Sequence, residues 1–174
     1  MNFSPGQVVV HPHHGPATLK KVTTRTVNKQ RRRYLMLDVH HTDLSLALPQ
    51  ERAEELGLRG ILDAEGVQDI FALLLEPSPP VDRTWSRRIK DYTTRFNSGN
   101  VRTIAALIRD MVRRDADKGL SFGERTVLRD AKEPFIAELS LAMSVPAEEV
   151  EVLVDTAVLE GRTPQVPGAL AAVS

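Results

Sequence analysis

The sequence predicts an α+β protein in which a small antiparallel β barrel, or a strongly bent sheet, precedes an all-α helical domain. Two observations lead to this division. Up to Pro49 the chain carries four or five short runs of β-branched or alternating apolar residues and no helical pattern. After Pro49, apolar residues recur every three or four positions, which is typical of amphipathic helices. We therefore expect domains at residues 1–50 and 51–162 and a loosely ordered tail at 163–174.

The expected strands follow one another closely. We place them at residues 7–10, 17–24, 34–39 and 44–48, and the last shows clean period-two alternation. A turn signal, Ser4-Pro5-Gly6, precedes the first strand, and the basic segment 27–33 looks like a hairpin loop between the second and third. Short strands at such spacing favour antiparallel pairing.

Capping and proline signals mark the expected helices. We place these at 51–56, at 63–75, from Ser86 to about Ser98, from Asn100 onward, from Ser121 toward Met143, and from Pro146 to Gly161. Asn100 suits an N-cap, and Ser121 with Glu124 fits a capping box, in which each side chain accepts the other residue's free backbone N–H. Pro134 lies inside a helix and should kink or split it.

The net charge of zero conceals a segregation of charge along the chain. Residues 1–50 sum to +5, 51–82 to −6, 83–133 to +6 and 134–174 to −5. A locally basic block can attract a polyanion even when the whole chain is neutral. The alternative is that these charges only solvate helix faces.

Composition narrows the class of protein. Hydrophobic residues make up 41% of the chain, enough for a buried core, and the absence of cysteine excludes disulfides and thiolate metal sites. The N-terminus shows no signal peptide, and the longest apolar run, Ile70 to Leu75, is too short to span a membrane. We expect a cytoplasmic, monomeric protein without a membrane partner.

The histidines are the candidates for a metal site. All of them precede Pro49: His11, His13, His14, His40 and His41. Alternation would place His11 and His13 on one face of a strand, as in some metal sites, but Pro12 indicates a turn and no carboxylate motif accompanies them. The chain also lacks a glycine-rich phosphate loop, a nucleophile elbow and a paired-carboxylate signature. We expect no enzymatic activity, no cofactor and no metal.

The segment from Thr84 to Lys90 places the single tryptophan among cations at a helix start. Trp85 could be the first rung of the apolar stripe Ile89, Tyr92 and Phe96, and spacing alone favours this interpretation. In the alternative interpretation the indole is exposed, so that it can stack on bases while neighbouring cations hold phosphates. Those cations are Arg87, Arg88 and Lys90, with Arg113, Arg114 and Arg125 further along, unless the latter are ordinary solvated surface.

An ordered set of short motifs runs through residues 1–160. The motifs are VVVHPHHG at 8–15, TRT at 24–26, YL at 34–35, WSRR at 85–88, RRD at 113–115 and GLS at 119–121. The set resembles the CarD/CdnL family of bacterial transcription regulators. The resemblance implies a Tudor-like N-terminal domain, of the type shared with the transcription-repair coupling factor, that binds the β subunit of RNA polymerase. It also implies a helical domain that contacts promoter DNA at the upstream edge of the melted region. Such a protein stabilises the open promoter complex and does not read a particular sequence.

The resemblance also implies roles for individual residues. Trp85 matches the family's tryptophan wedge, Arg87, Arg88, Lys90 and Arg125 fall at or near its DNA-contacting positions, and Arg114 is added as a candidate. Arg25 matches an arginine that the family uses against the polymerase. A second such arginine is common within the strand at 44–48, where this chain has Ala47. Losing a guanidinium from an interface ion pair could cost about 2 kcal/mol or more, so we expect a weaker or redirected polymerase contact, for which residues 31–33 could compensate.

Two other functions stay open at this point. The first is a protein-interaction adaptor, or a variant paralogue, with weakened polymerase or DNA contact. The second is a histidine-based metalloprotein. Salt-dependent DNA affinity separates the adaptor from the regulator, and elemental analysis tests the metalloprotein.

Overall fold

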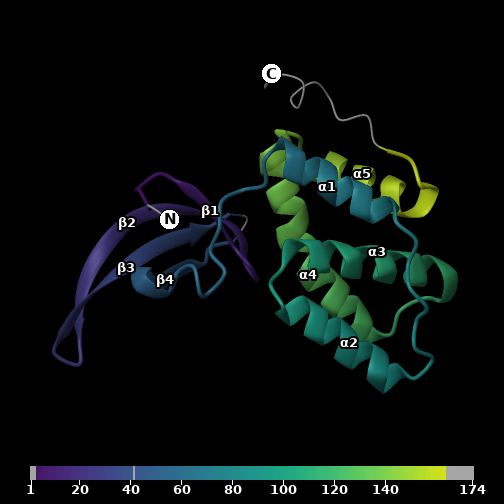
Figure 1. Ribbon diagram of the computed structural model, residues 1–174, viewed down its shortest axis with the longest axis horizontal. Coiled ribbons are helices and arrows are strands. Elements are labelled where there is room, and N and C mark those ends of the chain that lie inside the picture. The colour runs from purple at the N-terminus through teal and green to yellow at the C-terminus, as the bar shows by residue number, and fades with distance from the viewer. Residues whose placement is uncertain (1–2, 41, 164–174) are drawn as a thin grey trace. The chain divides into compact units, whose positions relative to one another are not determined.

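The computed structural model describes residues 3–40 and 42–163. The chain forms two compact units, Met1–Ile61 and Leu62–Ser174, which we call the N-terminal unit and the helical unit. The N-terminal unit holds a four-stranded antiparallel sheet, and the helical unit holds five α-helices in its described part (Figure 1). This is the α+β architecture that the sequence predicts.

The sheet of the N-terminal unit is a curled half-barrel of the expected Tudor-like type. Its strands lie in the order β1-β2-β3-β4, with bounds Val8–His11, Gly15–Val27, Gln30–Val39 and Ser45–Pro49. Strands β2 and β3 form a long hairpin (Figure 1), whose turn residues Asn28 and Lys29 both have positive φ, as tight hairpin turns require. A register shift between Leu19 and Lys21 interrupts their pairing, and such a bulge increases the bend of a sheet.

The N-terminal unit extends beyond the expected boundary near Pro49. After β4 the chain forms only a short 3-10 helix, η1 (Gln50–Arg52), in place of the predicted helix at 51–56. Ala53 and Leu58 are buried in the same core as the sheet residues Leu35 and Leu37. Arg59 then pairs with Val10 of β1. Residues 51–61, which the sequence analysis assigned to the helical domain, therefore complete the core of the N-terminal unit.

Helix α3 lies at the centre of the helical unit. The five helices are α1 Ala64–Leu75, α2 Trp85–Asn97, α3 Val101–Lys118, α4 Phe122–Met143 and α5 Ala147–Glu160. Helix α3 packs on each of the other four, and its Leu107, Ile108 and Met111 are fully buried. Within the described residues, no helix combines the length and apolar character needed to cross a bilayer.

Local capping chemistry sets the helix boundaries, much as the sequence predicts. Asn100 accepts hydrogen bonds from two backbone N–H groups at the start of α3, and Ser121 with Glu124 forms the expected capping box on α4. Helix α4 continues through Pro134, so the chain is not split there, and buried neighbours such as Phe135 hold the helix in place. Of the tail expected at 163–174, residues 164–174 lie outside the described part of the chain.

Candidate nucleic-acid interface

Trp85 is exposed at the first position of α2. Its side chain retains 51% of its accessible surface, whereas Tyr92, one of the residues on the apolar stripe of α2, is only 2% exposed. The indole Nε1–H donates a hydrogen bond to Ser121 Oγ at 3.0 Å, which ties the ring to the N-terminus of α4. The interpretation of Trp85 as a rung of the core stripe is therefore wrong, and the ring has an accessible face.

The capping box of α4 also anchors the indole. Ser121 Oγ accepts from the backbone N–H of Glu124 at 3.3 Å as well as from Trp85 Nε1. Glu124 Oε2 accepts in return from the backbone N–H of Ser121 at 2.9 Å. One hydroxyl thus closes the N-terminus of α4 and orients the ring at the N-terminus of α2.

Arg88 is buried, unlike its neighbour Arg87. It is 8% exposed, its Nε donates to Glu124 Oε1 at 3.0 Å, and one terminal nitrogen donates to the carbonyl oxygens of Asp82 and Arg83. Burial alone would raise the pKa of Glu124, but hydrogen bonds from the Ser121 backbone and from Arg88 outweigh it and hold that pKa below its usual range. The geometry gives Arg88 an internal structural role, while its predicted contact with DNA stays a prediction.

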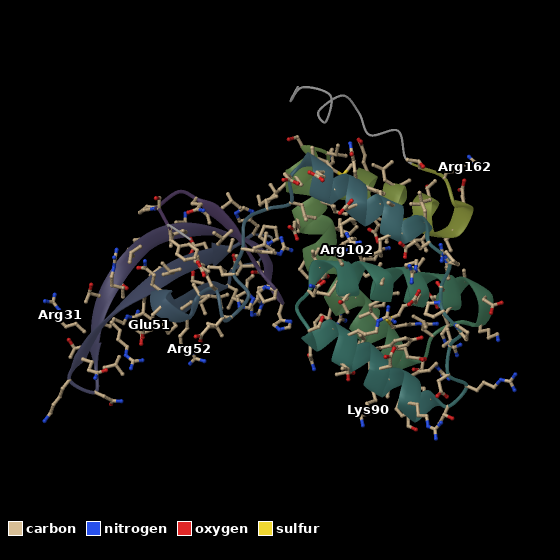
Figure 2. The ribbon with its side chains drawn as sticks, in the orientation of Figure 1. Arg31, Glu51, Arg52, Lys90, Arg102 and Arg162 are labelled. Atoms are coloured by element: carbon tan, nitrogen blue, oxygen red, sulfur yellow. The ribbon has the colours of Figure 1, made fainter. Side chains whose placement is uncertain are left out.

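Three other cations of the predicted patch are exposed near the indole. Arg87 lies in the first turn of α2, and its guanidinium lies 3.8 Å from a carboxylate oxygen of the exposed Asp82, a weak and screened pair. Lys90 reaches outward from α2 (Figure 2). Arg125 is exposed in the first turn of α4. Because the N-termini of both helices meet through Ser121, their free N–H groups add to the positive potential at this end of the unit.

Arg114 occupies an intermediate position. Its side chain is 17% exposed, and its Nε lies 3.9 Å from Glu124 Oε1 with no hydrogen-bond acceptor in range among the described residues. It borders a hollow of about 480 Å³ together with Arg83 and Lys118. Arg114 is thus less exposed to solvent than Arg87, Lys90 and Arg125, although it adds positive charge to the same unit.

Phe122 is a conspicuous residue that the sequence analysis missed. It is 89% exposed at the first position of α4, directly after the serine that holds Trp85. The sequence contains no signal that marks Phe122 as exposed. Its proximity to Trp85 arises from a contact between residues 36 positions apart, which the sequence pattern does not show.

The polymerase-contact candidates share the outer face of the sheet in the N-terminal unit. Strand alternation turns Leu35 and Leu37 into the core, so the residues between and before them face outward. Cross-strand pairing sets Arg25 opposite Arg32 and Ala47 opposite Met36. The Arg25 guanidinium lies 5.6 Å from the centre of the Tyr34 ring on the same face.

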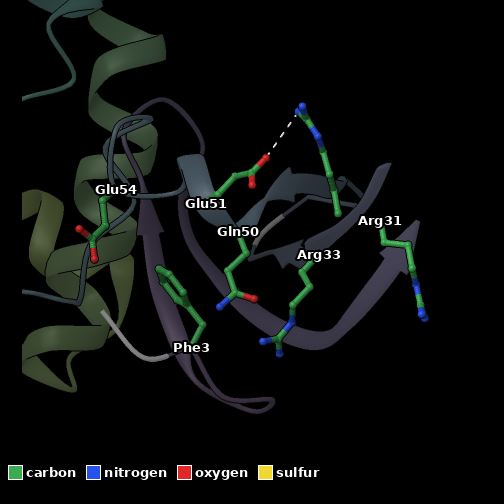
Figure 3. Close-up of a pocket in the computed structure, with 7 residues that line it drawn as sticks. Phe3, Arg31, Arg33, Gln50, Glu51 and Glu54 are labelled. Carbon is green, nitrogen blue, oxygen red and sulfur yellow. Dashed lines mark ion pairs between the residues drawn. The ribbon is translucent and has the colours of Figure 1, made fainter. Parts of the chain in front are cut away.

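The three arginines at 31–33 are therefore not equivalent. Arg32 has the outward register of Arg25, whereas Arg31 and Arg33 share the register of the buried Leu35. Arg32 lies 3.5 Å from Glu51, the ion pair drawn in Figure 3. All three border an open hollow of about 530 Å³ lined also by Phe3, Gln50, Glu51 and Glu54. Among residues 31–33, which were expected to compensate for Ala47, only Arg32 projects from the face of the sheet that carries Ala47.

Three of the histidines cluster at the end of β1 and just after it. The ring centres of His11 and His14 are 4.7 Å apart, and those of His11 and His13 are 6.1 Å apart. Burial, aided by the neighbouring His14 and His13, lowers the pKa of His11 to about 4. Within residues 3–40 and 42–163, no group of three or more His, Asp or Glu side chains is arranged to hold a metal ion. His40 Nε2 lies 2.7 Å from Thr18 Oγ1, and His41 lies outside the described residues.

Comparison with known proteins assigns a domain family to each unit. Residues 3–62 match the CarD-like/TRCF RID domain, and residues 69–155 match the CarD C-terminal domain. "Putative transcription factor YdeB" of Bacillus subtilis (strain 168) is 20% identical over 149 residues, which cover 86% of this chain and 97% of that protein. A Tudor-like half-barrel joined to this helical domain defines a class of transcription-related proteins. The chain belongs to the CarD/CdnL family of that class.

Proposed function

We propose that this protein is a non-enzymatic transcription regulator that bridges RNA polymerase and promoter DNA. The N-terminal unit binds the polymerase β subunit, and the helical unit binds DNA at the upstream edge of the transcription bubble and stabilises the open complex. The observation that carries the DNA-binding half is the exposed indole of Trp85, held at two joined helix N-termini beside Arg87, Lys90 and Arg125. Family membership supports the polymerase-binding half.

The exposed cations support weak DNA binding that is independent of sequence. If Arg87, Lys90 and Arg125 each neutralise one phosphate, the logarithm of the binding constant falls with log salt at a slope of about −2.7, or about 40-fold between 50 and 200 mM. Such affinity is low for a free protein. Binding to polymerase would raise the effective concentration at the promoter to the millimolar range, which makes the weak contact sufficient.

The indole supplies a preference for melted DNA. Unstacking a base step costs a few kcal/mol, and an aromatic ring placed against the exposed base face recovers part of this cost. A protein that binds the open promoter better than the closed one shifts the equilibrium by that difference in binding free energy. No catalytic group is required for this effect.

The outer face of the sheet is our proposed polymerase-binding surface. Arg25 and Tyr34 lie on this face, and Ala47 offers no charge where relatives of this family commonly have arginine. We propose that Arg32, opposite Arg25 in the sheet, supplies the second cation. Its ion pair with Glu51 is exposed on both sides and therefore costs little to exchange for an interface carboxylate.

The decisive test replaces Trp85 and follows the lifetime of the open complex. With full-length protein and purified polymerase, Trp85→Ala should shorten that lifetime about tenfold, because stacking of one base on an aromatic ring contributes at least about 1 kcal/mol. Val152→Ala, which truncates an exposed residue of α5, is the matched control. Thermal unfolding of both variants should match the parent, and an unchanged lifetime for Trp85→Ala would refute the proposal.

Neutralising the exposed cations separates the regulator from the adaptor. The triple change of Arg87, Lys90 and Arg125 to Gln should weaken DNA binding in the presence of polymerase and flatten its dependence on salt. Unchanged DNA affinity would favour a protein-interaction adaptor, with the helical unit serving another partner.

A further inference from the structure

We propose that Phe122 is a second aromatic contact to the DNA, so that the helical unit presents a pair of rings, Trp85 and Phe122, to the melted promoter. This inference rests on the proposed function, because it names a further residue of the same binding surface. Nothing in the sequence pattern had marked Phe122 for this role.

The first argument is exposure. The chain has eight aromatic residues of the Phe, Tyr and Trp types, all within the described part, and only Trp85 and Phe122 among them are exposed. Phe122 is 89% exposed, more than any other large hydrophobic residue in the described part of the chain. A single exposed apolar side chain needs no explanation, but here both exposed rings occur together.

The second argument is position. Phe122 follows Ser121, whose Oγ accepts the hydrogen bond of the Trp85 indole at 3.0 Å, so Phe122 is the next residue along the chain from the one that holds the indole. Each occupies the first position of its helix, Trp85 on α2 and Phe122 on α4. The start of α4 packs against α2, since a Cβ added to Gly123 would lie 3.9 Å from Ile89 Cδ1, an ordinary contact distance. The pair therefore belongs to a packed part of the fold.

The third argument identifies the occupant by charge. Exposed Arg87 and Arg125 lie in the first turns of the same two helices, and Lys90 follows one turn later on α2. Apolar rings among cations and free helix N–H groups suit a ligand that offers phosphates and flat apolar faces together, which unstacked DNA does. A hydrophobic groove of a protein partner would have to bury these charges. We therefore assign the phenyl ring to a base or deoxyribose next to the nucleotide that Trp85 contacts.

The experiment measures the affinity of full-length protein for two DNA probes over a series of salt concentrations. One probe is a duplex ending in a single-stranded segment, which mimics the upstream fork, and the other is a fully paired duplex. Phe122→Ala should weaken binding to the fork about three- to tenfold, with a smaller loss on the duplex and an unchanged salt slope, because a phenyl ring neutralises no phosphate. Phe122→Trp should retain the parent affinity, and Val152→Ala is the control for loss of an exposed apolar side chain.

The outcomes distinguish this inference from the proposed function. If Trp85→Ala weakens fork binding and Phe122→Ala does not, the inference is overturned and the proposed function stands. If Trp85→Ala, Phe122→Ala and the neutralised cations all leave DNA binding unchanged, both fail. If Phe122→Ala reduces capture of polymerase at unchanged DNA affinity, the ring meets protein and the inference is likewise overturned.

Discussion

The two units present their arginines to partners by different means. On the sheet of the N-terminal unit, strand alternation decides from which face an arginine projects, and Arg25 and Arg32 share one face because they pair directly across β2 and β3. On α2 of the helical unit, the consecutive residues Arg87 and Arg88 point in different directions, since each step along a helix rotates about 100°. Arg87 is solvated and Arg88 is buried against Glu124. A run of arginines on a helix therefore mixes binding residues with structural ones.

The largest expected effect is a loss of stability that separates the structural arginine of α2 from the solvated one. Arg88→Ala should reduce the free energy of unfolding of the helical unit by about 3–5 kcal/mol, because it removes the closest cation from the buried carboxylate of Glu124 and leaves it the Ser121 N–H and Arg114 at 3.9 Å. Arg87→Ala should change it by less than about 0.5 kcal/mol. Urea unfolding followed by circular dichroism measures both. An Arg88→Ala protein of normal stability but poor DNA affinity would instead make Arg88 a DNA contact.

On the sheet, polymerase binding tests whether strand register selects the arginines that contact a partner. Arg25→Ala should weaken capture of the polymerase β subunit by about 2 kcal/mol, and Arg32→Ala by a smaller amount. Arg33→Ala, which removes the same charge from the opposite register, is the control and should have little effect. Surface-immobilised polymerase and full-length protein in solution suffice for the measurement. Equal losses for Arg32 and Arg33 would show that register does not select the contact.

Replacing Ser121 should have a smaller effect, because it removes both the cap of α4 and the anchor of the indole. Ser121→Ala should cost about 1 kcal/mol of stability through loss of the cap, and it should also free the indole. Asn100→Ala removes another N-cap at a similar cost without touching Trp85. Because Trp85 is the single tryptophan, its fluorescence emission and anisotropy report on the ring directly. A change of emission in both variants would contradict a specific anchoring role.

The smallest expected effect concerns pH and belongs to the N-terminal unit. The folded-state pKa of His11, about 4, lies below the ordinary value of 6.5, so folding favours the neutral ring. Its contribution to stability is complete above pH 6.5 and is lost as the pH falls toward 4, by an amount of the order of 1 kcal/mol after solvent screening. Titration of the histidine ring protons by NMR checks the value. A midpoint near 6.5 for His11 would show that the ring is solvated, and His11→Asn should flatten the pH dependence.

Local chemistry accounts for what the sequence could predict. The strand near 44–48, the cap at Asn100 and the capping box at Ser121 were correct because each depends on residues within a few positions of one another. The hairpin loop expected at 27–33 was too long, since β2 reaches Val27 and β3 begins at Gln30. The end of the N-terminal unit lies at Ile61 because Ala53 and Leu58 pack on distant strands. That packing leaves no periodic signal in a segment so short.

At the candidate site too, the sequence could not predict which side chains are exposed and which are buried. The 4-3-4 spacing of Trp85, Ile89, Tyr92 and Phe96 is compatible with both a buried and an exposed indole. The hydrogen bond to Ser121 shows where the ring lies, and the pairing of Arg88 with Glu124 shows which arginine is internal. Both contacts join residues 36 positions apart, so only the tertiary structure could reveal them.

The double use of the Ser121 hydroxyl narrows the amino acids that this position can accept. An aspartate would still cap α4, yet it would set a negative charge beside the indole and repel an approaching phosphate. Alanine would meet neither donor. Threonine keeps an uncharged hydroxyl oxygen that can receive both hydrogens, so a single oxygen atom links the folding of this helix to the shape of the surface offered to DNA.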